Sequence, residues 1–567
     1  MSQQLIECVP NFSEGRDLAI IKQITDQIET VEGISLLDVD PGQATNRTVV
    51  TFVGTPDAVI EAAVRAGRKA AELIDMSKHR GEHPRFGSMD VCPLVPVANI
   101  TMDETIPHAH KLARRLGEEL GLTIYCYEHA AITPDRRNLA VVRAGEYEDL
   151  AEKLGKPEWK PDFGPIGFNA RSGVTAVGAR DFLVAYNINL NTTSTRRANA
   201  IAFDVREKGR KKREGDALTG PVVKDAQGRD VWIPGTLKCV KGIGWFIEEY
   251  GVAQVSFNLT NINVTPVHIA FDESSKAAAA SGVRVTGSEL VGLIPLGAML
   301  DAGRYFLKKQ QRSAGISDRE LIKIATKSLG LDDLHPFKPE KKIIEYAIAA
   351  RGSHSAKLVD RTLTGFVHET ASESPAPGGG SVAATMGAMG AALATMVANL
   401  SAHKRGWDDR WEEFFDWAEK GKALHDDLLG LIDEDTEASN AIMTAFGLPG
   451  TTHDQKTART EAIEDATKHA IEIPFRVMQV AYASMAVSKA MAETGNPNSI
   501  SDAGVGAIAA RSGVMGAYLN VRINASGVRD KAWIEDILER GEEIQEKAMV
   551  EEQRILELAE KALKRGE

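Results

Sequence analysis

The sequence predicts a multidomain protein: two α/β units of the α+β sandwich type, followed by an all-α helical domain. The chain has 567 residues, which is too long for a single hydrophobic core. Strand-like and helix-like patterns alternate along the first half, as they do in α/β folds. Beyond residue 342 helical periodicity dominates. We therefore expect α/β units at 1–181 and 182–326, a linker at 327–342 and a helical domain at 343–567.

The first unit opens the alternation with two strand-like runs. ISLLDVD (34–40) and TVVTFVG (48–54) are apolar, rich in β-branched residues and of strand length. The turn-rich segment PGQATNR lies between them. Helical periodicity follows, with Pro56 near its start, where a proline fits best. In order, we expect a helix at 56–76, a strand at 89–97, a helix at 101–121 and a strand at 122–130.

The second unit begins with the apolar run GARDFLVAYNINLN (178–191), which leads into Asn187 and Asn189. We expect a helix at 195–209, strands at 242–250 and 252–264, and a closing helix at about 288–308. KSLGLDDLHPFKPEKK (327–342) combines glycine, two prolines and mixed charge, which is typical of a linker. The helical domain then contains three long amphipathic patterns at 411–446, 473–493 and 533–563.

Charge and composition exclude several functions. The formal net charge is −12, which argues against general nucleic-acid binding because that requires a basic face. The four cysteines are scattered without metal-ligand spacing, so buried, reduced thiols are expected. No signal-like apolar core opens the chain, and the apolar run 382–400 is rich in Ala and Gly, which insert weakly into membranes. We expect a cytoplasmic protein with no membrane or nucleic-acid partner.

Two polar clusters in the first unit suggest a site. His83, in RGEHPRFGSMDVCP (80–93), lies between Glu82 and Pro84 just before a predicted strand, and histidine is suited to exchange protons near neutral pH. The alternative is a loop histidine bonded to a carbonyl group. Asp40, Asn46 and Arg47 lie around the loop between two strands, where α/β sheets often build sites. The alternative there is a surface loop pair.

Two connecting segments are also candidates. Residues 161–181 join the two units, and ligand grooves are common at such junctions. Phe163 and Phe168 of this segment are placed to stack on a flat heterocycle, although a plain interdomain linker explains it as well. The basic stretch 205–216 would attract a polyanionic tail in an otherwise acidic protein, or it is simply a solvated loop.

The helical domain contains an unusual glycine turn. Gly378, Gly379 and Gly380 precede a helix of small residues, which leaves backbone N–H groups free to face an anion. Tight helix packing alone explains the small residues. DEDTEAS (433–439) places three acids in a row, but Asp433 and Asp435 are two apart and cannot share a helix face. Asp502 lies near the start of another small-residue helix, where a capping role is the default.

These segments together resemble a known family in both halves. The first half resembles formimidoyltransferases in ECVPNFSEGRD (7–17), LLDVDPGQATNRTVVTFVG (36–54), GEHPRFGSMDVCPLVPV (81–97), PDFGP (161–165), GARDFLVAYNINL (178–190) and AQVSFNLTN (253–261). The second half resembles formimidoyltetrahydrofolate cyclodeaminases in SPAPGGGSVAA (374–384), DEDTEA (433–438), SDAGVGA (501–507) and GAYLNVRIN (516–524). The resemblance covers almost the whole chain, in the order of the bifunctional formimidoyltransferase-cyclodeaminases of histidine degradation.

The resemblance implies both a fold and a set of site residues. Folate would bind in the groove between the two α/β subdomains of the transferase, and the helical cyclodeaminase would form dimers. The catalytic histidine of the GEHPR motif is His83 here, and the second acid of the D-x-D pair is Asp435. The folate-contacting segment corresponds to 163–172, which keeps the FGP opening (Phe163, Gly164 and Pro165) but departs from the family pattern later.

The chemistry implied is a transfer followed by a ring closure. The first half would move a formimidoyl group from N-formimidoyl-L-glutamate to tetrahydrofolate, the co-substrate, which we expect to be polyglutamylated. We assign proton transfer to His83, support of the cationic amidine to Asp40, and substrate carboxylates to Arg47 beside Asn46.

The second half would form 5,10-methenyltetrahydrofolate and ammonia, with Asp435 as the acid and Asp502 as second choice. The glycine turn would hold the pterin carbonyl or the glutamate tail. We expect no metal and at least a homodimer. Two alternatives remain open: formimidoylglycine as the donor, and a non-catalytic folate-binding scaffold.

Overall fold

The structure, a computed structural model, describes residues 4–43, 45–81, 84–215, 219–350, 357–374 and 376–566. The chain forms two compact units, which divide it differently from the predicted boundaries. The first comprises Met1–Ala302 and Ala325–Gly352, and the second comprises Gly303–Ile324 and Ser353–Glu567.

The predicted linker 327–342 therefore belongs to the first unit. A parallel bridge between Ile294 and Ile343 ties the end of this segment to that unit. Residues 303–324 belong to the helical unit instead, where Lys422 Nζ lies 2.7 Å from Asp318 Oδ1 and Asn399 donates to the carbonyl of Gly315 over 2.6 Å. The composition of a segment predicts only its local conformation. The compact unit to which the segment belongs depends on contacts with distant residues such as these.

The first sheet of the first unit is mixed. Its strand order is β1-β4-β2-β5-β7-β6, with β3 paired to β4 and β1 also paired to β5. Only the β5–β7 and β6–β7 pairs are parallel. The strands are β1 (Leu5–Cys8), β2 (Asn11–Phe12), β3 (Ile34–Gly42), β4 (Arg47–Gly54), β5 (Met89–Ala98), β6 (Thr123–Glu128) and β7 (Val174–Ala179).

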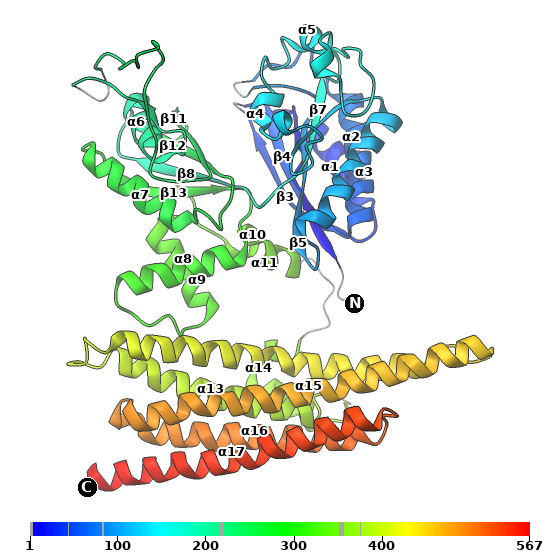
Figure 1. The fold of residues 1–567 in the computed structure, drawn as a ribbon, viewed down its shortest axis with the longest axis vertical. Helices are drawn as coiled ribbons and strands as arrows, with labels where there is room; N and C mark the ends of the chain where they lie inside the picture. The colour runs from blue at the N-terminus through cyan, green and yellow to red at the C-terminus, as the bar shows by residue number, and fades with distance from the viewer. Residues whose placement is uncertain are drawn as a thin grey trace. The chain divides into compact units, whose positions relative to one another are not determined.

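Three helices cover one face of this sheet (Figure 1): α1 (Leu18–Glu29), α2 (Pro56–Leu73) and α3 (Met102–Leu120). The core lies between the helices and the strands and contains fully buried Phe52 and Tyr125. Cys8, Cys92 and Cys126 are buried free thiols, as predicted, whereas Cys239 is only half-buried. The candidate site described below lies on the opposite face of the sheet.

The second sheet is antiparallel, in the order β11-β12-β8-β13. Its strands are β8 (Val184–Leu190), β11 (Val240–Ile247), β12 (Val252–Leu259) and β13 (Val285–Val291), with α6 (Thr195–Val205) and α7 (Val267–Ala280) packed on one face (Figure 1). The helix predicted at about 288–308 begins later, because β13 pairs with β8 and α8 (Leu296–Lys309) follows it. The basic stretch contributes β9 (Arg210–Lys211), which pairs with β10 (Trp232–Ile233).

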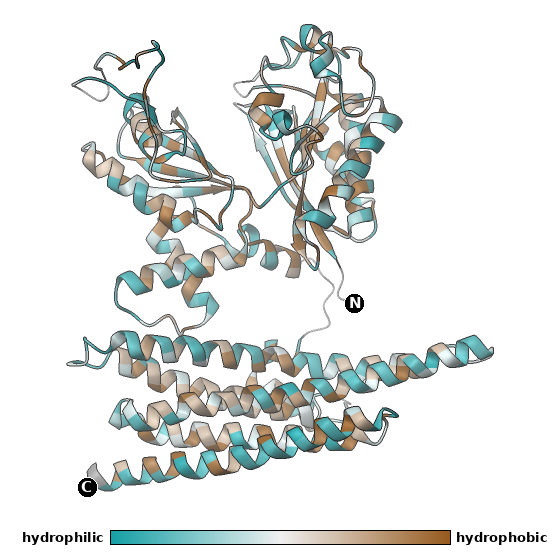
Figure 2. Cartoon of the chain, in the orientation of Figure 1, coloured by the Kyte–Doolittle hydropathy of each residue, from teal (hydrophilic) through white to brown (hydrophobic). Residues whose placement is uncertain are grey.

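The second unit is helical, as predicted. Its long helices are α13 (Gly379–Ala402), α14 (Trp411–Phe446), α15 (His453–Thr494), α16 (Ile500–Ala525) and α17 (Lys531–Gly566). Hydrophilic and hydrophobic residues alternate along α14, α15 and α17 (Figure 2), as expected of helices that bury one side. The shorter elements of the chain are η1 (Pro134–Arg136), α4 (Leu139–Val142), α5 (Leu150–Leu154), η2 (Pro157–Trp159), α9 (Asp318–Leu329), α10 (Pro339–Lys342), α11 (Ile344–Ala349), η3 (Leu358–Asp360), α12 (Leu363–Thr370) and η4 (Pro497–Ser499).

Small residues let α13 and α16 pack backbone to backbone. A Cβ added at Gly390 would lie 2.6 Å from the carbonyl oxygen of Gly506, and one at Gly513 would lie 2.9 Å from that of Ala383. Among the described residues, α13 is the one helix long and apolar enough to cross a membrane, but 61% of its most apolar window is buried inside the unit. Its composition is therefore explained by its place in the helical core.

Candidate functional sites

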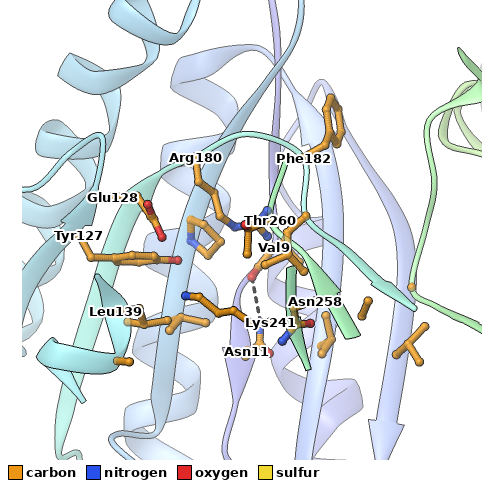
Figure 3. Close-up of a pocket in the computed structure, with 18 of the residues that line it drawn as sticks. Val9, Asn11, Tyr127, Glu128, Leu139, Arg180, Phe182, Lys241, Asn258 and Thr260 are labelled. Atoms are coloured by element: carbon orange, nitrogen blue, oxygen red, sulfur yellow. Dashed lines mark hydrogen bonds between the residues drawn. The ribbon is translucent and has the colours of Figure 1, made fainter. Parts of the chain in front are cut away.

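A cavity of about 1220 Å³ lies in the first unit and is lined from both sheets. Asn11 and Tyr127 line it from the first sheet, and Lys241 and Asn258 line it from the second (Figure 3). Its charged lining is mixed. The cationic side chains are Arg47, Arg137, Arg143, Arg180 and Lys241, and the acidic ones are Glu7, Asp40, Glu128, Glu146, Asp181 and Glu289.

Arg47 is held by a buried carboxylate. Asp90 of β5 is fully buried and pairs with both Arg47 and Arg143, and Arg47 Nε also donates to Asn11 Oδ1 over 3.0 Å. Burial lowers the pKa of both guanidinium groups, that of Arg143 to about 10, so Arg143 remains charged at neutral pH. Sequence reasoning missed Asp90, although an acid inside an apolar strand is an unusual signal.

The structure separates the other residues predicted around this site. Asp40, on β3 opposite Val49, lines the cavity. Asn46 does not: its side chain accepts from the backbone N–H of Gly15 over 3.0 Å and donates to the carbonyl of Arg80 over 2.9 Å, so it braces two loops. His83 lies outside the described residues, whereas the next residue, Pro84, lines the cavity.

The aromatic segment predicted to contact folate packs against the edge strand β6, and its folate contact stays a prediction. Phe163, Gly164, Pro165 and Phe168 are not among the residues that line the cavity. The carbonyl groups of Phe163 and Pro165 accept from Ile124 N and Thr123 Oγ1, each over 3.0 Å. Gly164 has a φ of 80°, and its added Cβ would lie 1.9 Å from the carbonyl oxygen of Leu122. These hydrogen bonds occupy backbone carbonyl groups that an unpaired linker would leave free to bind a ligand.

In the helical unit, Asp435 meets the glycine turn. Ser381 Oγ lies 3.0 Å from Asp435 Oδ2, and an added Cβ at Gly380 would lie 2.0 Å from Asp435 Oδ1. Burial raises the pKa of Asp435, and hydrogen bonds from the hydroxyl and backbone N–H of Ser381 partly offset this. Asp433 is engaged elsewhere, because it accepts from the backbone N–H of Leu358 over 2.6 Å.

The turn itself begins α13, with Gly378 as the N-cap. Gly379 lies against α16, where its added Cβ would be 3.2 Å from Asn520 Nδ2. Sequence reasoning identified the three glycines and Asp435 but missed Ser381 and Asn520, although both lie within the motifs SPAPGGGSVAA and GAYLNVRIN. The two segments that contain Ser381 and Asp435 are more than 50 residues apart in the chain, so no local pattern pairs them.

Asp502 lies elsewhere in the unit. It is a half-buried residue in the first turn of α16, whereas Asn520 is 18 residues further along the same helix. At 1.5 Å per residue this separation is about 27 Å. Within one chain, therefore, Asp502 does not share the site of Asp435. The described part of the chain also holds no group of three or more His, Cys, Asp or Glu placed to bind a metal ion.

Comparisons with known proteins cover nearly the whole chain. Family models match in three consecutive segments: the N-terminal subdomain of the formiminotransferase domain at 5–180, the formiminotransferase domain at 185–349 and formiminotransferase-cyclodeaminase at 362–543. The formimidoyltransferase-cyclodeaminase of Gallus gallus is 44% identical over 528 residues, which are 93% of this chain and 94% of that protein.

Two further relatives each match part of the chain. The glutamate formimidoyltransferase of Thermoplasma acidophilum is 40% identical over 324 residues, 57% of this chain and 98% of that protein. The methenyltetrahydrofolate cyclohydrolase of Methylorubrum extorquens is 39% identical over 198 residues, 35% of this chain and 95% of that protein. With full-length relatives at this identity, and with both halves matched in order, the chain belongs to the formimidoyltransferase-cyclodeaminase family.

Proposed function

We propose that the first unit transfers a formimidoyl group from N-formimidoyl-L-glutamate to N5 of tetrahydrofolate, and that the helical unit cyclises the product. The observation that carries this proposal is that each compact unit brings together residues predicted for one of the two steps. Asp40 and Arg47 line the cavity of the first unit, and Asp435 meets the glycine turn of the second. The family models for the formiminotransferase domain and for formiminotransferase-cyclodeaminase match the corresponding segments of the chain.

The transfer requires one proton to leave and another to arrive. N5 attacks the amidine carbon, and the tetrahedral intermediate collapses by breaking the bond between that carbon and the nitrogen of glutamate. N5 loses a proton and the departing nitrogen gains one, so a single imidazole can act first as base and then as acid. We assign this role to His83. Asp40 stabilises the cationic amidine, and Arg47 binds a donor carboxylate through its planar guanidinium group.

The ring closure requires an acid for the leaving ammonia. N10 attacks the formimidoyl carbon of 5-formimidoyltetrahydrofolate, the bond from that carbon to its terminal nitrogen breaks, and 5,10-methenyltetrahydrofolate forms. A carboxyl group that is held in its protonated form can supply the proton. Asp435 is suited to this, because burial raises its pKa. The glycine turn that begins α13 lies beside Asp435, because an added Cβ at Gly380 would lie 2.0 Å from Asp435 Oδ1.

The combined assay of both steps tests this proposal. Wild-type enzyme, formimidoylglutamate and tetrahydrofolate should give glutamate, ammonia and the absorbance of methenyltetrahydrofolate. His83→Ala should lose glutamate release and still cyclise supplied 5-formimidoyltetrahydrofolate, whereas Asp435→Asn should show the reverse. Normal glutamate release by His83→Ala, or efficient use of formimidoylglycine in place of the glutamate donor, would contradict the corresponding assignment. Tight folate binding without ammonia release would indicate a scaffold.

We propose a second activity for the helical unit, because part of this chain is similar to a methenyltetrahydrofolate cyclohydrolase, at 39% identity over 198 residues. If the unit also hydrolysed the methenyl product, the absorbance would rise and then decay faster than in an enzyme-free control. A stable absorbance would restrict the unit to cyclisation.

We also propose that the natural folate is polyglutamylated and that basic residues of 205–216 hold its tail. Several of these cations are already paired, Arg210 with Asp204 and Lys211 with Asp230, whereas Lys208 and Lys212 are exposed. Replacing these two lysines by alanine should release more free intermediate with polyglutamylated folate only. An equal effect with the monoglutamate would remove the tail from the explanation.

Finally, we propose a cytoplasmic homo-oligomer, at least a dimer. Large apolar side chains are exposed along α16, with Leu519 at 63% and Ile523 at 72%, and such patches commonly mark subunit contacts. Sedimentation of the full chain tests this: replacing both residues by serine should shift the protein toward monomer. A monomeric wild-type chain at micromolar concentration would contradict the proposal.

A further inference from the structure

A buried carboxyl group of the first unit plays no part in the chemistry assigned so far. Glu7 lies in the middle of β1, where Ile6 and Cys8 point into the helix-covered core. Because side chains alternate along a strand, Glu7 points to the opposite face, and it lines the cavity. Its side chain is only 4% exposed.

The carboxyl group of Glu7 makes no hydrogen bond or ion pair with any residue that the structure describes. Its neighbours across the strands are apolar, Val53 on β4 and Val95 on β5. A buried polar group without a partner is unfavourable, so such groups are normally hydrogen-bonded. The remaining direction is the cavity, and a ligand with N–H donors would supply the missing partners.

The protonation of Glu7 reflects this environment. Burial raises the pKa of its carboxyl group to about 7, although the nearby Arg180 lowers it and Glu345 of α11 raises it slightly. The group is therefore about half ionised at neutral pH. A ligand that donates hydrogen bonds would favour the ionised form and lower this pKa.

Arg180 places a donor beside this acceptor. It follows β7 directly, lines the cavity and extends toward Thr260 (Figure 3). One of its N–H groups donates to the carbonyl of Asp181 over 2.9 Å, which leaves others for a ligand, since a guanidinium group has five. The apolar residues Phe182, Leu293 and Ile344 line the same part of the cavity, so it suits a flat, uncharged ring.

On the basis of the proposed function, we propose that Glu7 and Arg180 form the subsite for the pterin ring of tetrahydrofolate. Glu7 accepts hydrogen bonds from the 2-amino group and N3–H, and Arg180 donates one to the 4-oxo group. The pterin edge presents donors and an acceptor side by side and carries no charge. The amidine of the formimidoyl donor fits less well, because it is cationic and Arg180 would repel it.

The position of Glu7 along the sheet agrees with the transfer chemistry. Glu7 pairs with Val53 and Asp40 pairs with Val49 on the same strand, β4. Four residues of strand correspond to about 13 Å. The pterin has two fused rings: the 2-amino group is attached to one, and N5 belongs to the other. A pterin bound at Glu7 therefore directs N5 toward Asp40, on the side where Pro84 also lines the cavity.

Equilibrium dialysis of the full chain tests the subsite without relying on turnover. The probes are 5-methyltetrahydrofolate, whose N5 is blocked, and its analogue in which a methyl group replaces the 2-amino group. Sites built to bind a hydrogen-bonding group reject analogues that lack it. Wild-type enzyme should contain one class of site that binds the analogue at least about tenfold more weakly. This comparison needs no variant, so a folding defect cannot account for it.

The variant Glu7→Gln should lose that discrimination and bind 5-methyltetrahydrofolate about tenfold more weakly at the same site. Wild-type affinity there should increase from pH 6 to pH 8, as Glu7 ionises, and the affinity of Glu7→Gln should not. A matched control is Glu289→Gln, because Glu289 also lines the cavity but already has a partner in Tyr250. The control should keep the wild-type discrimination against the analogue.

Unchanged folate binding by Glu7→Gln, or equal binding of both probes by wild type, would overturn the inference. A selective rise in the KM of the formimidoyl donor would also overturn it and would assign Glu7 to the amidine. Glutamate release is measured on the same preparations. If folate binding depended on Glu7 but no glutamate were released, the subsite would be supported. Only the proposed function would then be contradicted.

Discussion

The hydroxyl group of Ser381 lies 3.0 Å from Asp435 Oδ2 and 3.1 Å from the carbonyl oxygen of Ile432. It has one hydrogen to donate and therefore shares it between the carboxylate and the backbone of α14. The backbone N–H of Ser381 also binds Asp435. Both hydrogen bonds favour the ionised carboxylate, whereas burial favours the protonated one. The pKa of Asp435 is raised because burial has the larger effect.

Removing the hydroxyl should extend cyclodeaminase activity to higher pH. In Ser381→Ala the ionised form of Asp435 loses a hydrogen bond of about 1 kcal/mol, so the pKa of Asp435 rises further. Because Asp435 acts as an acid, the decline of ammonia release on the alkaline side should move to higher pH. The measurement is the pH profile of ammonia release from supplied 5-formimidoyltetrahydrofolate. Ser401→Ala removes another buried hydroxyl from α13 and should leave the profile in place; a shift toward lower pH in Ser381→Ala would contradict this role.

A methyl group at Gly380 should abolish cyclisation while the transferase remains active. The added Cβ would lie 2.0 Å from Asp435 Oδ1, so the carboxyl group or the turn must move, at a cost of about 1–3 kcal/mol. Gly380→Ala should lose about 100-fold or more of ammonia release, with glutamate release unchanged. Gly430→Ala is the control, because an added Cβ there meets Glu434 at 3.8 Å, an ordinary contact, and alanine favours the helix. Normal cyclisation by Gly380→Ala would place the acid elsewhere.

Neutralising Asp90 should destabilise the first unit. In Asp90→Asn two largely buried arginines, Arg47 and Arg143, lose their shared carboxylate, and loss of one partner from a buried ion pair costs about 3–5 kcal/mol. We expect a lower urea midpoint and loss of glutamate release, measured on the full chain. Asp57→Asn breaks an exposed pair with Lys111, which should cost less than about 1 kcal/mol. Equal midpoints for the two variants would show that Asp90 does not stabilise the unit.

Asp502 should be dispensable for cyclisation if one chain forms the site. Asp502→Asn should release ammonia within about twofold of wild type, since the residue lies about 27 Å from the Asn520 end of α16. Asp435→Asn should lose about 100-fold or more, the contribution of a positioned acid. Ammonia release from supplied 5-formimidoyltetrahydrofolate compares the two variants. A comparable loss in Asp502→Asn would mean that a second copy of the chain brings Asp502 to the site.

Local patterns predicted most elements of the fold. The helix predicted at 411–446 is α14 with the same ends, because its amphipathic period continues without interruption. The closing helix of the second unit was predicted too early, at about 288–308. Its first residues form β13, which depends on pairing with β8, a strand about 100 residues earlier. A strand that forms through pairing with a distant strand need not show a hydrophobic period in its own sequence that distinguishes it from a helix.

For the candidate sites as well, local sequence predicted some features, whereas others depended on contacts between distant segments. Asp40 and Arg47 were predicted from polar residues at strand ends, the glycine turn from its place before a helix, and Asp435 from the family resemblance; the structure places Asp40 and Arg47 on one cavity and Asp435 against Gly380. Asn46 and the 163–168 segment have equally suggestive sequences. Their polar groups instead bind neighbouring backbone, at Gly15 and Arg80 for Asn46. A polar group is free to bind a ligand only if backbone groups from distant segments do not already form hydrogen bonds with it.

By itself the sequence determined the two kinds of architecture, the family resemblance and the residues with the right chemistry, because periodicity and short motifs are local properties. Only the tertiary structure decided which of those residues meet. It placed Glu7 in a cavity without a partner among the described residues, gave Asp90 two arginines, and brought Ser381 to Asp435. The reason is physical: burial and hydrogen-bond partners arise when segments far apart in the chain pack together, and they set both the pKa of a carboxyl group and its freedom to bind a ligand.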